Sequence, residues 1–536
     1  MSLTSAFQIG RSGLAAAQLG IQTAGNNVAN AATPGYSRQV ATLAPTRDTQ
    51  VGSLFVGRGV EVSAIRRQVD TALQARLLKG TSSESAASTE ASLLSQVEAA
   101  LNGLGDDNLS SDLSKFFEAW STLSDNPTNT GTRALVVQQG RALSDSLRAT
   151  RTSLTDQRAQ VDRDLRSQVA RADDLLSQVA GLNAEIVSAE NGQGSASGLR
   201  DQRDAVVNEL AKLLDITTVG QPNGNLDVLV GSTPVVLAGK SRGVALVQEA
   251  VGNQVAVRVV AKDSQEELSI GSGSVGALLA NRTTAIDGTL AQIDTLARNL
   301  ILEVNLVHAA GYGSQQVAST TSGLAVPPAD TTRALNDPAN STFNDLPFKP
   351  KSGSFLITIT NKATGAAQTQ RVNVDLDGIT APGTAGFTDD TSLTTLAAGI
   401  NAALGATGSA TLGTDGRLTI AAAAGNVVSF GEDSSGVLAA LGINTYFKGT
   451  SAANIDVRAE LVADSSLLNY GRVSNGQPVE NGAALSIAQL RTRTISGLNG
   501  GTFASSWDDT VQAVGVSTGA AKTAAQAAEV VRQNLD

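Results

Sequence analysis

The chain contains no cysteine, one methionine and one histidine, His308, among its 536 residues. These scarcities exclude a cysteine nucleophile, a thiolate zinc site and any metal centre built from several histidines, because each needs ligands that the sequence does not supply. Charged residues make up 16% of the chain, below the usual quarter or so, and aromatic residues make up 3%. We therefore expect no catalytic site, no metal site and no cofactor.

Long hydrophobic runs and an excess of basic charge are missing as well. Apolar stretches are interrupted well before the roughly 18 residues that a membrane span requires, and residues 1–30 lack the basic start and apolar core of a cleavable signal. The net charge of −10 argues against a nucleic-acid partner, because neutralising phosphates needs clustered Lys and Arg. Glycine is abundant, with 53 residues. A weakly charged surface of small residues favours close packing of copies, as in a subunit of an assembly.

The most regular feature of the sequence is a heptad pattern at its start. Phe7, Leu14, Ile21 and Val28 recur every seven residues, and Leu3, Gly10, Ala17, Ala24 and Ala31 occupy the second position of the same frame. This period predicts a helix with one narrow apolar stripe, suited to left-handed coiled-coil packing. An ordinary amphipathic helix within its own domain is the alternative. We call Leu3, Phe7, Leu14, Ala17, Ile21, Ala24 and Val28 the assembly seam.

Turn residues follow the seam directly. The helix is expected to end near Asn30, because Thr33-Pro34-Gly35-Tyr36 is typical of a type II turn, with Pro at its second and Gly at its third position. Strand-like residues 55–56 and 60–62 flank Gly57-Arg58-Gly59, which predicts a hairpin between them.

Helical and strand-like patterns then alternate along the chain. Residues 70–215 are predicted to be helical, with one long helix where Gly and Pro are absent between Arg141 and Ala180. Within it, Leu147, Leu154 and Val161 are seven apart, and Leu165, Ala172, Val179 and Ile186 resume the period after a four-residue offset. Alternating apolar residues predict strands within 216–274, with a turn at Gly252-Asn253, and within 350–450, where a short helix is expected at 394–404.

These patterns predict a multidomain α+β chain: an elongated α-helical trunk, built from N- and C-terminal chain segments, with inserted β-rich domains and an N-terminal coiled-coil helix. The expected domains are an N-terminal axial region at 1–69, a helical trunk at 70–215, 275–315 and 480–536, a β-rich insertion at 216–274, and an outer β insertion domain at 345–455. The heptad spacing of Trp507, Val514, Ala521, Ala528 and Leu535 runs up to Asp536 without a stop signal. We expect either a truncated chain or a helix that continues beyond it.

Four enzyme-like signals are weak. Gly271 to Gly276 matches G-x-G-x-x-G but lacks the acidic residue about 20 positions later, so a strand-to-helix loop is expected. Asn373 to Gly378 imitates half of a calcium loop without its final Glu, and Asp377-Gly378 is expected to form a hairpin turn. His308 is expected to be buried or capping rather than catalytic. Asp201, Arg203 and Asp204 are expected to be solvated or locally paired.

A stronger signal lies in Asn26-Asn27-Val28-Ala29-Asn30, followed by Thr33, Pro34, Gly35, Tyr36 and Arg38. This stretch resembles the N-terminal signature of bacterial flagellar rod, hook and hook-associated axial proteins. Further matching stretches are Phe116-Phe117, Asn126-Pro127, Leu199 to Asp204, Asn208-Glu209-Leu210 and Val304-Asn305 with His308 and Gly311. Because they lie in the helical trunk, they favour the proteins of the hook–filament junction over hook protein and flagellin.

The resemblance implies a structural protein of the flagellum, located outside the cell between hook and filament and exported without signal cleavage. Implied partners are other copies in a ring-like layer, the hook protein, a second junction protein, and an export chaperone whose binding segment is expected to be absent here. Neither nucleic acid nor membrane insertion is expected. Two alternatives stay open: another axial protein, such as hook or distal rod protein, and a secreted adhesin or glycan-binding protein that uses the outer β domain.

Overall fold

The computed structural model describes residues 3–51, 53–101, 108–191, 194–251, 254–380, 383–474 and 477–535. The turn expected at Gly252-Asn253 lies outside them. The chain divides into two compact units, one formed by 1–96, 157–285 and 516–536 and the other by 97–156 and 286–515. No helix within the described ranges combines the length and apolar character needed to cross a lipid bilayer.

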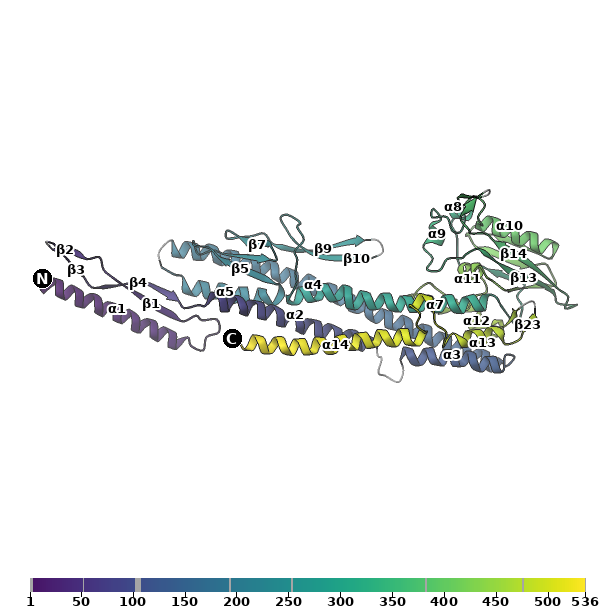
Figure 1. Cartoon of the computed structure of the whole chain (residues 1–536), viewed down its shortest axis with the longest axis horizontal. Coiled ribbons are helices and arrows are strands. Elements are labelled where there is room, and N and C mark those ends of the chain that lie inside the picture. The colour runs from purple at the N-terminus through teal and green to yellow at the C-terminus, as the bar shows by residue number, and fades with distance from the viewer. Residues whose placement is uncertain are drawn as a thin grey trace. The chain divides into compact units, whose positions relative to one another are not determined.

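The first unit begins with one helix packed on two nested hairpins (Figure 1). Helix α1 (Leu3–Ala29) ends where the turn signals place its end. The outer hairpin pairs β1 (Gln39–Pro45) with β4 (Val60–Arg67), and the inner one pairs β2 (Thr49–Val51) with β3 (Leu54–Val56). The predicted pairing of residues 55–56 with 60–62 is therefore wrong. Gly57-Arg58-Gly59 instead links the inner hairpin to the outer one, because β3 pairs with β2 and β4 pairs with β1, both upstream in the chain.

Helices make up much of the remainder of this unit. They are parts of α2 (Thr71–Leu101), α4 (Thr130–Glu190) and α14 (Phe503–Gln533), together with α5 (Ser197–Leu213) and α6 (Gly273–Asn281). Helices α2 and α14 share a small apolar cluster of Ala91, Leu94 and Ala521. Helix α4 has 61 residues without a break, several times the mean helix length. Its predicted offset heptads are confirmed, because all seven of their apolar residues are buried.

The strands predicted within 216–274 are present in this unit. A four-stranded antiparallel sheet has the order β5-β6-β7-β8, and a separate hairpin pairs β9 with β10. Their bounds are β5 (Ile216–Gly220), β6 (Leu226–Val230), β7 (Thr233–Leu237), β8 (Lys240–Ser241), β9 (Val244–Val251) and β10 (Gln254–Ala261). A π-helical turn (Arg282–Asp287) follows α6.

The second unit contains an aromatic core between helices. Helix α3 (Leu109–Asp125) buries Leu109, Leu113, Phe117 and Trp120, the face that its sequence predicts. It packs against α13 (Gly482–Gln489), which also contacts α7 (Gly288–Ala309). Tyr446 and Phe447 insert beside these helices, with ring centroids 5.9 and 5.7 Å from that of Phe116. Both ring pairs are tilted, and aromatic pairs at such separations contribute beyond their buried area.

A second, larger core lies under the strands of residues 319–431. Three-stranded sheets have the orders β14-β13-β19 and β12-β18-β17, and α10 packs against β14 and β17. The bounds are β12 (Ser319–Thr321), β13 (Gly353–Asn361), β14 (Ala367–Val374), α10 (Leu393–Leu404), β17 (Gly408–Leu412), β18 (Leu418–Ala422) and β19 (Asn426–Gly431). The helix expected at 394–404 is confirmed, one residue longer at its start.

Short elements complete this unit. They are β11 (Gly311–Gly313), α8 (Pro328–Thr331), α9 (Ser341–Asn344), β15 (Ile379–Thr380), β16 (Thr384–Ala385), α11 (Val437–Leu441), β20 (Phe447–Lys448), β21 (Asp456–Val457), α12 (Ala459–Ala463), β22 (Asn469–Ser474) and β23 (Gln477–Val479). Three-residue 3-10 turns lie at Gly405–Thr407, Ser465–Leu467 and Ser496–Leu498. Mixed helix and strand with long helices is thus confirmed, whereas a coiled coil and inserted domains remain predictions.

Candidate assembly surface

The inner face of α1 is held on the outer hairpin by few buried side chains. Within residues 3–67, Ala16 and Thr23 are the described side chains that reach full burial. The hydroxyl of Ser12 accepts a 3.2 Å hydrogen bond from the backbone N–H of Val60. Gly59 has φ +107°, and a Cβ atom there would lie 2.2 Å from that hydroxyl oxygen. Glycine is therefore required where the hairpin approaches the helix.

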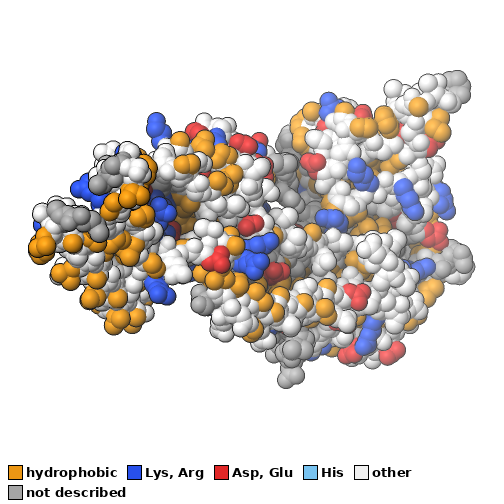
Figure 2. Space-filling view, turned by 60° about the vertical axis from the view of Figure 1, so that its left-hand side comes forward, with side chains coloured by type: hydrophobic (Ala, Val, Ile, Leu, Met, Phe, Trp, Pro, Cys, Tyr) orange, Lys and Arg blue, Asp and Glu red, His pale blue; other side chains and the backbone are white. Residues whose placement is uncertain are grey.

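The outer face of α1 carries the assembly seam, and the structure leaves every seam residue exposed. Leu3, Phe7, Leu14, Ile21 and Val28 are 62–93% exposed. Figure 2 shows apolar side chains gathered over this part of the chain. Nine of the 22 exposed large apolar residues in the described ranges lie in residues 3–67, the five above with Val40, Leu43, Leu54 and Phe55. Contiguous exposed apolar surface of this kind marks an interaction site.

The asparagines of the axial-protein motif form a polar clamp between α1 and the start of β1. The side-chain NH₂ of Asn27 donates to the carbonyl of Gln39 at 2.8 Å, and its Oδ1 accepts from the N–H of Gln39 at 2.9 Å. The hydroxyl of Tyr36 donates to the same Oδ1 at 2.9 Å. Asn30 donates to the backbone oxygen of Asn26 at 3.0 Å. The motif therefore fixes how the chain leaves the helix.

The turn between helix and strand has the predicted geometry. The N–H of Tyr36 donates to the carbonyl of Thr33 at 3.2 Å, and Gly35, two residues after Thr33, has φ +79°. A positive φ at that position is what a type II turn needs, with Pro34 before it. The side chain of Arg38 is exposed, and no ion pair holds it within the described residues. Whether these motif residues take part in assembly stays a prediction.

Ion pairs that the sequence does not reveal join this region to α5. The guanidinium of Arg67 lies 2.6 Å from a carboxylate oxygen of Asp201 and 2.8 Å from one of Asp204. The second oxygen of Asp201 accepts from the N–H of Ser37 at 3.4 Å. Asp201 and Asp204 were expected to be solvated or locally paired, but their partners are far away in the sequence. No pattern around Arg67 signals a partner 134 residues later.

Arg203, between these two aspartates, points the other way and is buried. It donates to the side-chain oxygen of Asn183 on α4 and to the carbonyl of Gly224, both at 2.8 Å. Burial lowers the pKa of Arg203 to about 10, which leaves it cationic at neutral pH. Asn183 also bonds the N–H and the carbonyl of Leu226. One turn of α5 thus contacts the N-terminal region on one side and the β5-β6 loop on the other.

His308 is buried at the end of α7, as its sequence context predicts, and it joins three segments. Its Nδ1–H donates to the carbonyl of Asn444 at 2.8 Å, and its Nε2 accepts from the N–H of Asn469 at 3.1 Å. Its ring lies edge-on to those of Trp120 and Tyr446. With both ring nitrogens occupied by backbone groups, His308 is a structural cross-link.

Acid is expected to destabilise this core through His308. Burial, opposed by the bond to Asn444 and aided by the charge of Arg458, lowers the pKa of His308 from 6.5 to about 4. Because the native state binds fewer protons than the unfolded chain between these pKa values, the free energy of unfolding falls as pH drops through this window. The expected loss between pH 7 and pH 5 is about 2 kcal/mol.

Urea unfolding followed by Trp fluorescence measures this effect, since Trp120 and Trp507 both lie in the second unit. The control is His308→Gln, whose unfolding free energy should change less between the two pH values even if its stability is lower throughout. Equal pH dependence in both proteins would contradict the assignment.

Two further enzyme-like signals of the sequence, the G-x-G-x-x-G stretch and Asp377-Gly378, have structural explanations in the described residues. Gly273 begins α6 with φ +75°, and a Cβ there would lie 2.5 Å from the carbonyl oxygen of Leu213. The G-x-G-x-x-G stretch is therefore packed against α5 rather than open to a dinucleotide. Asp377-Gly378 joins β14 to β15, which do not pair with each other, so the hairpin turn predicted there is wrong.

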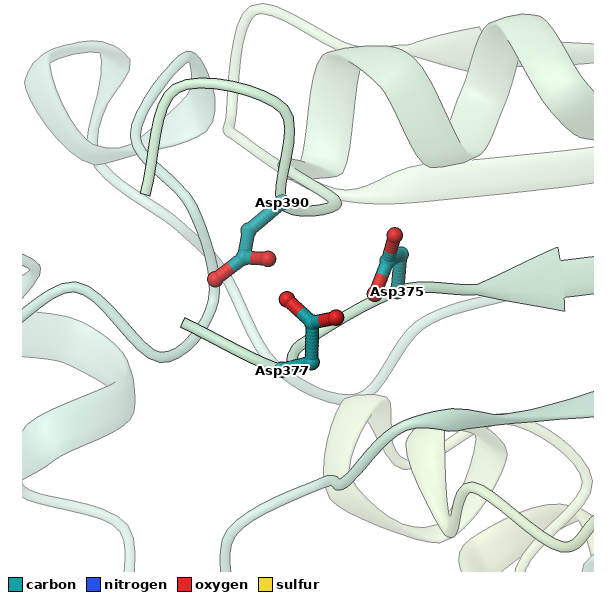
Figure 3. Close-up of side chains that lie close together, drawn as sticks. All are labelled: Asp375, Asp377 and Asp390. Carbon is teal, nitrogen blue, oxygen red and sulfur yellow. The ribbon is translucent and has the colours of Figure 1, made fainter. Parts of the chain in front are cut away.

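Asp375, Asp377 and Asp390 do bring three carboxylates together in the described part of the chain, with ligand atoms within 4.8 Å of one another (Figure 3). Asp390 is buried and accepts from the N–H of Gly378 at 3.1 Å and from the side chain of Asn336 at 2.6 Å. Asp375 and Asp377 are exposed. The buried Asp390 thus already accepts hydrogen bonds from backbone and side-chain amides. The two exposed carboxylates alone do not identify a cation site.

Comparison with known proteins agrees with this architecture. The family described as "Flagellar hook-associated protein FlgK helical domain" matches residues 94–321, and the family "Flagella basal body rod protein" matches residues 7–36. Flagellar hook-associated protein 1 of Salmonella typhimurium is 30% identical over 330 residues, which cover 58% of this chain and 57% of that protein. The Bacillus subtilis protein of the same name is 28% identical over 325 residues, 59% and 57% of the two chains.

The matched stretch thus spans little more than half the length of these relatives. Among solved structures, the flagellar hook junction protein FlgK from Burkholderia pseudomallei is similar with a TM-score of 0.55 and 16% identity, covering 86% of this chain and 98% of that one. That likeness concerns the fold alone. The match at 94–321 includes the stretches from Phe116 to Gly311 on which the sequence resemblance rests, and the match at 7–36 includes the axial-protein motif up to Tyr36 but not Arg38. The chain is thus similar to flagellar hook-associated protein 1 over little more than half of its length, and its residues 94–321 match the helical domain of FlgK.

Proposed function

We propose that the chain is a structural component of the bacterial flagellum that joins hook to filament by assembling with copies of itself into a junction layer. The observation that carries the proposal is the exposed seam on α1, which lies next to the axial-protein motif in a chain that contains a FlgK helical domain. The chain's own fold does not use the seam side chains, so they are available to neighbouring subunits.

In this proposal the seam of α1 packs in the inner tube of the flagellum, and the helical domain supplies further contacts between subunits. The expected partners are other copies, the hook protein, a second junction protein and an export chaperone. The chain acts outside the cell, after export without signal cleavage, and has no catalytic role. The division into an axial region, a trunk and two β insertions belongs to the same proposal.

The alternatives have less support. The match of residues 94–321 to the FlgK helical domain, together with relatives named flagellar hook-associated protein 1, favours a hook-associated protein over a hook or distal rod protein. A glycan-binding role for the outer strands rests on no described feature of residues 345–455.

Deleting the gene from its own bacterium tests the proposal. Flagellin should then leave the cell as monomer instead of polymerising, because the filament has no junction on which to grow. The measurement is motility in soft agar together with the amount of monomeric flagellin in the medium, and the control is the same strain with the gene restored. A deletion strain that swims normally and keeps its filaments would refute the assignment.

A further inference from the structure

The N-terminal module, residues 3–68, is attached to the rest of the first unit in an unusual way. Its described hydrogen bonds and ion pairs to that unit converge on two carboxylates of α5. Arg67 contacts Asp201 and Asp204 at 2.6 and 2.8 Å, and the N–H of Ser37 reaches Asp201 at 3.4 Å. The three charged side chains are 11–17% exposed, so solvent screens them only in part.

The covalent link beside this contact is very short. Gln68 still belongs to the module, because its N–H donates to the carbonyl of Arg38 at 2.8 Å. Asp70 already belongs to α2, because its carboxylate accepts from the N–H groups of Ala72 and Leu73 at 2.9 and 3.1 Å. Val69 alone stands between the two sets of bonds. A single residue with two free backbone torsions is enough for a swivel.

The module also brings little apolar core to the attachment. Ala16 and Thr23, its fully buried side chains in the described ranges, lie on the face of α1 that meets the module's own hairpin. Ion pairs can break and re-form, whereas a shared apolar core would have to be disrupted before the module could move. The geometry of the ion pairs is also favourable. The planar guanidinium of Arg67 has several N–H donors, and the carboxylates of Asp201 and Asp204, one helical turn apart, can accept hydrogen bonds from them.

We propose that Arg67, Asp201 and Asp204 form a charge latch that positions the N-terminal module, and that opening the latch frees the module to swing about Val69. Asp201 and Asp204 are positioning residues in this scheme: they hold the part that carries the seam, and they do not themselves touch a neighbour. This role goes beyond the proposed function, and its test requires no flagellum.

Limited trypsin digestion of the full chain tests the latch directly, because trypsin cleaves after Arg67. In the closed latch this arginine is held by two carboxylates. Asp201→Asn with Asp204→Asn keeps the side-chain shapes and removes both charges, and it should raise the rate of cleavage after Arg67 about tenfold, in proportion to the open population. The matched control is Glu190→Gln at the end of α4, which breaks the 2.7 Å pair of Glu190 with Arg200, the residue next to Asp201 on α5. That variant should leave cleavage after Arg67 unchanged.

A second measurement separates latch opening from misfolding. Because the chain has no cysteine, Gln18→Cys on α1 and Ala205→Cys on α5 can carry two spin labels. Electron–electron distance measurements should give a narrow distribution in the labelled parent and a broad one after Arg67→Glu. Adding Asp201→Lys and Asp204→Lys to Arg67→Glu reverses the charges on both sides and should restore the narrow distribution.

The proposal fails if neutralising both aspartates leaves cleavage after Arg67 as slow as before. It also fails if the labelled parent already shows a broad distribution, or if the charge-reversed protein stays as broad as Arg67→Glu alone.

Discussion

Replacing Leu14 and Ile21 together with Asp is expected to abolish assembly at the junction while leaving the chain folded. The two side chains are 62% and 73% exposed, so most of their apolar surface is not buried by the isolated chain and the change should cost its fold little. In an assembled layer, the lost transfer free energy of two apolar side chains amounts to about 3–6 kcal/mol. This corresponds to an association constant about 10² to 10⁴ times lower for each contact, before the cost of burying two carboxylates is added.

Two measurements check this result. Far-UV circular dichroism of the purified variant should match that of the parent, and the variant should fail to restore motility in a deletion strain. The matched control is Gln8→Asp with Gln22→Asp, which places the same two charges, fourteen residues apart, on exposed positions of α1 outside the seam. If the seam variant restores motility as well as this control does, the seam is not the contact.

Changing Gly140 to Ala is expected to destabilise the second unit, against the usual behaviour of glycine in a helix. In an exposed helix interior, Gly to Ala stabilises by about 0.5–1 kcal/mol. Gly140 lies within α4, and a Cβ there would lie 2.0 Å from the hydroxyl oxygen of Tyr446 and 2.8 Å from the ring carbon that bears it. Tyr446 is fully buried, and its hydroxyl donates to the carbonyl of Val136 at 2.8 Å, so the ring cannot simply withdraw.

The expected cost of Gly140→Ala is about 1–3 kcal/mol for overpacking, with a further about 1–3 kcal/mol if the tyrosine hydroxyl loses its acceptor. Gly181→Ala, in the same helix, provides the control, because no atom lies within 4 Å of its added Cβ. That variant should be slightly more stable than the parent. Thermal unfolding compares the two, and a Gly140→Ala protein as stable as Gly181→Ala would show that the Tyr446 contact is not as close as described.

Periodic apolar patterns made the helices and their buried faces predictable. The heptads of α4 and the face of α3 that holds Trp120 could be read from spacing alone, because a helix places every third or fourth residue on one side. Strand pairing was harder to predict from the sequence. Residues 55–56 and 60–62 carry a local hairpin signal, yet each pairs with an upstream strand, and nothing in the local sequence tells these registers apart.

The seam could be proposed from the sequence, because a seven-residue period is visible without any structure. The contact of Arg67 with Asp201 and Asp204 could not be, since charge pairs leave no periodicity and the partners are far apart in the chain. The same holds for Asp390, which joins Asp375 and Asp377 only through folding. His308 illustrates a middle case: its burial followed from its apolar surroundings, whereas its two backbone partners depend on tertiary structure.

The exposure of the seam has a consequence for how such a subunit can change. Most of each of the Leu14 and Ile21 side chains lies outside the chain's own packing, so in the proposed assembly the strength of the contact between subunits and the stability of each subunit depend largely on different side chains. A substitution in the seam can tighten or loosen the joint without weakening the molecule that carries it. In evolution or in protein engineering, the affinity between subunits and the stability of each subunit can therefore be changed separately.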